Sequence, residues 1–116
     1  MTLDNFKCQI VSDSMEPVLK IGEVVRAEPI AAPDEVTRLK RFTLIVFKRD
    51  DRVLCHYIWR INQQVMPGTC VTRSLKNPFH DEVPVPFNDV LGQIREKVIP
   101  TWLRVLLVLN NALRGT

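Results

Sequence analysis

The stretch FTLIVFKRDDRVLCHYIWRIN, from Phe42 to Asn62, decides the fold that we expect for this chain. It is rich in Val, Ile, Phe, Tyr and Trp, the residue types that favour β-strands. Its polar centre KRDDR, from Lys48 to Arg52, has the composition of a turn. The pattern therefore predicts a β-hairpin whose two strands are joined near residues 48–52.

Shorter strand patterns flank this hairpin on both sides. Residues 6–11, 23–30 and 70–72 form apolar or β-branched runs, and residues 88–96 are typical of a short closing strand around Gly92. We expect a mostly β protein, a compact and partly closed antiparallel barrel with a short C-terminal helix. Residues 1–98 would form the β domain, and residues 99–116 the helix.

The composition is that of a single globular domain. With 116 residues, 46% of them hydrophobic and 25% charged, the chain can bury one core and is not expected to be disordered. The net charge of +3 comes from scattered basic residues, so we expect no nucleic-acid partner. The three cysteines lack zinc-site spacing, and the adjacent Cys55 and His56 should project to opposite faces of a strand. We therefore expect no metal and no cofactor.

The two ends of the chain bear on membrane contact. The segment MTLDNFKCQIV lacks a basic stretch followed by an apolar one, so we expect no signal peptide and a cytoplasmic or peripherally membrane-associated protein. Residues 99–116 contain an apolar run shorter than the ~20 residues that span a bilayer. This helix can pack on the domain, pair with a second copy in a homodimer, or contact a membrane surface peripherally. We favour protein packing, because a small domain needs apolar cover.

The segment SDSMEPVLKIGEVV, from Ser12 to Val25, has turn-forming residues, and a turn alone would explain them. It also resembles the nucleophile segment of the signal peptidase I and LexA-like serine peptidase superfamily, in which Ser-Met-x-Pro precedes a glycine and an apolar strand. Three further segments resemble motifs of that family and follow one another in the same order as those motifs: RFTLIVFKRDDRVLCHYIW, TRSLKNPFHDEV and VLGQI. The similar segments extend from residue 12 to residue 94 and point to a short member without an anchor.

The resemblance implies a serine endopeptidase that cleaves a precursor protein or a signal-like peptide. Ser14 would be the nucleophile, and His56 matches the general base of the histidine branch, which includes the endoplasmic-reticulum and archaeal-type enzymes. Asp81 matches the acidic position that completes a Ser-His-Asp triad. The hydroxyl of Ser12 and the backbone N–H of Ser14 would stabilise the oxyanion.

General chemistry agrees with these roles, because a serine hydroxyl needs a neighbouring base and a neutral imidazole can accept its proton. An aspartate can fix the imidazole tautomer and stabilise the imidazolium. Met15 and Pro17 would belong to the segment that binds the substrate. The family's habit of adding an extended peptide to a sheet edge implies a shallow cleft that accepts small side chains beside the cut.

Two departures from the family pattern support an alternative function. Tyr57 stands where the family usually has Arg. Leu75 stands where the family has the first aspartate of the acidic motif that TRSLKNPFHDEV resembles. A catalytically inactive binding or regulatory module with the peptidase fold would tolerate both. His80 competes with His56 as the base, but it adjoins Asp81, and neighbouring residues of an extended segment point to opposite sides.

Overall fold

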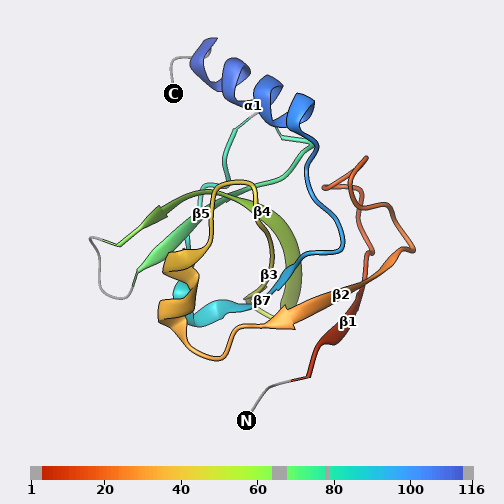
Figure 1. Ribbon diagram of the computed structural model, residues 1–116, viewed down its shortest axis with the longest axis vertical. Coiled ribbons are helices and arrows are strands. Elements are labelled where there is room, and N and C mark those ends of the chain that lie inside the picture. Colours follow the sequence, from red (N-terminus) through yellow and green to blue (C-terminus); the bar gives the residue numbers. More distant parts are fainter. Residues whose placement is uncertain (1–3, 64–67, 78, 114–116) are drawn as a thin grey trace.

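The protein folds as a single curved antiparallel sheet, which confirms the mostly β fold. The computed structural model describes residues 4–63, 68–77 and 79–113. The seven strands lie in the order β1-β2-β7-β3-β4-β5-β6, and the sheet curls without closing (Figure 1). The strands are β1 (Phe6–Gln9), β2 (Val24–Pro29), β3 (Leu44–Arg49), β4 (Arg52–Asn62), β5 (Thr69–Arg73), β6 (Val85–Pro86) and β7 (Val90–Ile94).

The predicted hairpin forms the centre of the sheet. β3 and β4 pair from Leu44 opposite Tyr57 to Arg49 opposite Arg52, which leaves Asp50 and Asp51 as the turn. All four apolar residues of β3 are buried, because β7 and β4 flank the strand and core side chains cover both of its faces. The hairpin therefore contributes to two cores at once.

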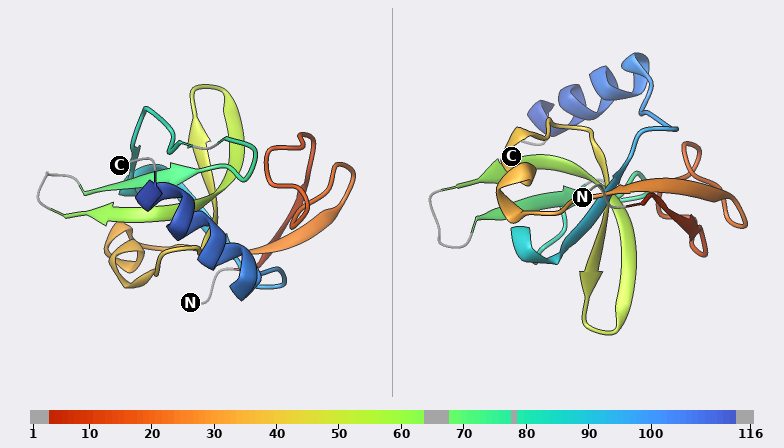
Figure 2. Two further views of the ribbon diagram at one scale, coloured as in Figure 1. Left: turned by 90° about the horizontal axis from the view of Figure 1, so that it is seen from above. Right: turned by 60° about the horizontal axis from the view of Figure 1, so that its bottom comes forward.

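These two cores lie on opposite faces of the hairpin, as strand alternation requires. The first contains Leu44, Val46 and Tyr57, together with residues of the loop after β1 and of the C-terminal helix. The second contains Ile45 and Phe47, and the 3-10 helices η1 (Pro33–Arg38) and η2 (Phe87–Asp89) contribute to it. Figure 2 shows how the elements surround the curved sheet.

Four elements depart from the sequence expectation. The stretch after β2 contains η1, which no pattern in the sequence indicated; Pro33 stands at its start and Val36 is fully buried. β6 and η2 were not expected, since a two-residue strand and a single 3-10 turn have no sequence period. The closing strand, β7, is shorter than residues 88–96.

The expected C-terminal helix is present as α1 (Thr101–Leu113). Leu107 is buried in the first core, and the partly buried Leu103 packs against it. The Arg104 guanidinium donates to the carbonyl of Ile99 at 2.7 Å and lies 5.5 Å from the Phe42 ring centroid. Among the described helices, none is long and apolar enough to cross a bilayer.

Gly92 allows β2 and β7 to approach closely, and its replacement tests the packing of the sheet. A Cβ at this position would lie 2.6 Å from the carbonyl oxygen of Glu28, a backbone atom that cannot rotate away. We expect Gly92→Ala to lower the free energy of unfolding by about 1–3 kcal/mol, measured by urea denaturation. The exposed Asn88→Ala control should change it by less than about 0.5 kcal/mol. A similarly small change for Gly92→Ala would contradict the close approach.

Candidate active site

The loop that carries Ser14 is closed at its base and anchored in the core. Ile10 donates its N–H to the Glu23 carbonyl at 2.8 Å, and Gly22 donates to the Ile10 carbonyl at 2.7 Å. Gly22 has a φ of 89°, a left-handed conformation that glycine adopts without steric cost. Met15 and Leu19 are 2% and 0% exposed, so their side chains anchor the loop in the core while Ser14 stays partly exposed.

Ser14 makes separate contacts with its side chain and its backbone. Its Oγ lies 3.1 Å from Ser12 Oγ, so the two hydroxyls share a hydrogen bond. Its carbonyl accepts the N–H groups of Leu75 and Lys76 at 2.9 Å and 3.2 Å. The N–H of Ser14 has no acceptor among the described residues, so it can donate to a ligand.

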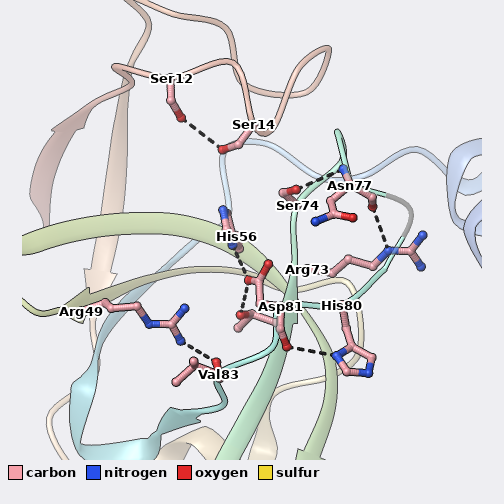
Figure 3. A network of polar contacts seen from close by, with 11 residues as sticks. Ser12, Ser14, Arg49, His56, Arg73, Ser74, Asn77, His80, Asp81 and Val83 are labelled. Carbon is pink, nitrogen blue, oxygen red and sulfur yellow. Dashed lines mark hydrogen bonds and ion pairs between the residues drawn. The ribbon is translucent and has the colours of Figure 1, made fainter.

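His56 lies on β4, and its ring is held between a carboxylate and an aromatic ring. Nδ1 is 2.6 Å from Asp81 Oδ2, and both side chains are only 14% exposed. The Phe47 ring meets the imidazole edge-on at a centroid distance of 5.8 Å. In Figure 3 the imidazole lies between Asp81 and Ser14, with its second nitrogen on the side of Ser14. Within the described part of the chain, Ser14 Oγ bonds Ser12 and not His56.

Asp81 is held by β5 through both its backbone and its side chain. Its N–H donates to the Thr72 carbonyl at 2.8 Å, and its Oδ2 accepts the Thr72 hydroxyl at 2.7 Å. Burial raises the pKa of Asp81, but the hydrogen bonds from His56 and Thr72 outweigh it, so the net pKa is lowered. The nearby charges of His56 and Arg49 act in the same direction. An ionised Asp81 only accepts hydrogen bonds, so Nδ1 of His56 is the donor in their contact.

One cleft is lined by candidate residues of the loop after β1 and of β4. Ser12, Ser14 and His56 line it, and its volume is about 780 Å³. Its apolar part includes Val46, Cys55 and Leu91.

Two strand edges that pair with no other described strand border this cleft. β1 is an edge strand of the sheet, and residues 6–9 line the cleft. Residues 52–56 of β4 line it as well, and they pair with β3 on one side, whereas β5 pairs only with residues 57–62 of β4. The cleft therefore offers backbone donors and acceptors from two strands, an arrangement that suits an extended polypeptide.

The other predicted site residues have distinct positions. Met15 lines the cleft from the core side, whereas Pro17 is exposed and is not among the described residues that line it. His80 is exposed, and its Nδ1 contacts the backbone carbonyl of Asp81 at 3.0 Å. In Figure 3 it lies on the far side of Asp81 from Ser14.

The two departures from the family pattern both belong to the first core. Leu75 is partly buried against that core, beside the loop that carries Ser14. Tyr57 is fully buried and stacks on Phe42 at a centroid distance of 5.8 Å. Tyr57 belongs to the first core, whereas the His56 ring lies against Phe47 of the second, so the two side chains occupy opposite faces of β4.

The cleft also contains the thiol of Cys55, which is partly buried. Burial raises the pKa of Cys55 to about 12, with a smaller contribution from Cys8. This thiol therefore stays protonated at neutral pH and is a poor nucleophile. Among the residues that the structure describes, no three His, Cys, Asp or Glu side chains are grouped so that they could hold a metal.

Sequence reasoning missed two parts of the site. Thr72 is the first residue of the segment TRSLKNPFHDEV, but its hydrogen bond to Asp81 depends on where β5 ends. The N–H groups of Leu75 and Lys76 are backbone donors, for which no side-chain pattern exists. A threonine nine residues before an aspartate was the only available signal, and it does not identify a hydrogen bond.

The contacts of Asp81 predict how its carboxyl group titrates. Its pKa, followed by the ¹³Cγ resonance in NMR, should lie below the ordinary value of 3.8. Thr72→Val removes one donor to the carboxylate and should raise this pKa, whereas Thr37→Val, which loses a bond to the Asp34 carbonyl, should not change it. A pKa for Asp81 at or above 3.8 in the wild type would contradict the arrangement.

The same lowered pKa predicts a pH dependence of stability. Because Asp81 titrates lower in the folded state than in the unfolded state, its stabilising effect is fully present above about pH 4 and is lost as the pH falls through the folded-state pKa. The difference in unfolding free energy between the wild type and Asp81→Asn should therefore shrink on acidification. A difference that grows towards low pH would have the wrong sign.

Comparison with known proteins gives no match to a family model, a curated protein or a solved structure. The family resemblance therefore depends on the short motifs themselves. A functional assignment has to depend on the contact between His56 and Asp81 and on the cleft that Ser14 and His56 both line.

Proposed function

We propose that this protein is a serine endopeptidase with Ser14 as nucleophile, His56 as general base and Asp81 as the group that orients the imidazole. The observation that carries the proposal is the 2.6 Å contact between His56 Nδ1 and Asp81 Oδ2, with the other ring nitrogen on the Ser14 side (Figure 3). A base whose far nitrogen is fixed by a carboxylate and whose near nitrogen faces a hydroxyl is the arrangement that nucleophilic catalysis by serine requires.

The proposed reaction has two halves. His56 Nε2 takes the proton of Ser14 as Oγ attacks the peptide carbonyl carbon, and the imidazolium then donates that proton to the leaving amine as the C–N bond breaks. In the second half His56 takes a proton from a water molecule as that water attacks the carbonyl carbon of the acyl-enzyme. The imidazolium then returns the proton to Ser14 Oγ as the ester C–O bond breaks and the acid is released. The lowered pKa of Asp81 fits this role, because an ionised carboxylate stabilises the imidazolium in both halves.

Two donors are suited to the oxyanion of the tetrahedral intermediate. The N–H of Ser14 has no acceptor among the described residues, and the Ser12 hydroxyl lies 3.1 Å from the attacking oxygen. Fixed donors of this kind act on charge that develops only in the transition state. Ser12 must turn its hydrogen from Ser14 towards the substrate oxygen for this purpose.

The proposed substrate is an extended segment of a precursor protein or a signal-like peptide. The free edges of β1 and of residues 52–56 can pair with such a segment from both sides. The apolar surface formed by Val46, Cys55 and Leu91 would then receive small apolar side chains next to the cut.

A non-catalytic peptide-binding module is the second candidate. The observation that favours it is that Ser14 Oγ bonds Ser12 and not His56. Catalytic hydrogen bonds are often long without substrate and tighten in the complex, so we place this candidate second.

Single substitutions separate the two candidates. We expect the wild type to cleave members of a proteome-derived peptide library, detected by mass spectrometry of new termini, and Ser14→Ala and His56→Ala to abolish this cleavage. Ser12→Ala should lower the rate about 10²-fold, because one oxyanion donor is lost. His80→Ala is the matched control and should cleave as the wild type does. Equal cleavage by Ser14→Ala would refute the proposed nucleophile, and a wild type that binds peptides without cleaving them would favour the module.

The proposed base also fixes the direction of the pH dependence. Only a deprotonated imidazole can accept the serine proton, so a histidine base predicts a kcat/KM that rises with pH and then levels off. Initial rates on one cleaved library peptide between pH 5 and pH 9 measure this. A rate that falls across this range would contradict a histidine base.

A further inference from the structure

Helix α1 has a second apolar face that points away from the domain. Figures 1 and 2 show α1 on the outside of the molecule, across one end of the curved sheet. We call the residues of this face the outer stripe, and each of them is between 46% and 85% exposed. The outer stripe consists of Trp102, Val105, Leu106, Leu109 and Leu113.

Helical geometry shows that these five side chains form one continuous surface. At about 100° per residue they fall within an arc of about 100°. The residues that contact the domain, Leu103 and Leu107, lie on the opposite side of the helix. The outer stripe therefore does not contribute to the core that α1 completes, and large apolar patches of this kind mark interaction surfaces.

The composition of the outer stripe favours a lipid surface as its occupant. A lipid surface requires no complementary shape, and a tryptophan at one end of the stripe suits the boundary between water and lipid.

The charges around α1 favour an anionic lipid surface. The sequence from Lys97 to the end contains no acidic residue. Lys40 and Arg41 are exposed and directly precede Phe42, over whose ring the Arg104 guanidinium lies. Phe42 packs on the same core as Leu103, and Arg104 lies on the domain side of α1, behind the outer stripe. The Arg41 guanidinium lies over the Trp59 ring and donates to the Trp59 carbonyl at 2.7 Å. If the stripe enters the acyl chains, the cations reach the depth of the headgroups.

We propose that the outer stripe of α1 inserts into the surface of an anionic lipid bilayer, with Lys40, Arg41 and Arg104 facing the lipid headgroups. The helix lies in the plane of the membrane and the β domain remains on the water side. This contact depends on the exposed face of α1 and not on the chemistry proposed for Ser14. A protein that never cleaves a peptide could still bind in this way.

Vesicle co-sedimentation of the full chain tests the proposal, with unilamellar vesicles of phosphatidylcholine alone or mixed with phosphatidylserine. The partition coefficient should be at least about fivefold higher on the anionic vesicles, and the difference should disappear in about 0.5 M salt. Leu109→Glu, which places a charge in the stripe and keeps a good helix former, should lower it at least about tenfold. The matched control, Val83→Glu, introduces the same charge at a position that is 59% exposed, against 53% for Leu109, and should remain within about twofold of the wild type.

Three results would overturn the proposal. The first is no partitioning of the wild type to either vesicle, and the second is equal partitioning of Leu109→Glu and the wild type. The third is a dimer in sedimentation velocity that Leu109→Glu dissociates and that does not bind lipid, which would assign the outer stripe to a second copy. Circular dichroism of Leu109→Glu shows whether the helix is retained, and Leu106→Ser provides a second variant if it is not.

Discussion

The arrangement of the site depends on the carbonyl of Ser14, which accepts hydrogen bonds from the N–H groups of Leu75 and Lys76. This contact joins the loop after β1 to the segment that follows β5. The same segment folds back on β5, where Asp81 makes both a backbone and a side-chain hydrogen bond with Thr72. The positions of the hydroxyl and the carboxylate are therefore set together, and the imidazole of His56 on β4 lies between them (Figure 3).

Leu75 and Tyr57 both belong to the first core. Leu75 is partly buried there, and Asp81 is the carboxylate that His56 contacts. The Tyr57 hydroxyl is buried without a hydrogen-bond partner among the described residues, and burial raises its pKa to about 12. An unbonded buried hydroxyl costs about 1–3 kcal/mol, which the stacking of Tyr57 on Phe42 offsets in part.

The sequence predicted the fold well where local patterns decide it and poorly where packing decides it. The β3–β4 hairpin and α1 follow from composition and turn residues, and both formed within a few residues of the expected bounds. η1 and β6 depend on contacts such as the burial of Val36 and Val85, which no local period indicates. At the site, the position of His80 directly before Asp81 ranked it below His56, but the bond from Thr72 to Asp81 arises only when the segment after β5 folds back on that strand.

The most direct test of the central claim is ¹¹B NMR of the protein with a peptidyl boronic acid, since a serine oxygen activated by an oriented imidazole should add to boron. We predict that the trigonal boron becomes tetrahedral in the wild type, with the adduct mapped to Ser14 by mass spectrometry, and that it stays trigonal in Ser14→Ala and His56→Ala. Boron that stays trigonal while the peptide occupies the cleft, or an adduct at another residue, would contradict the account.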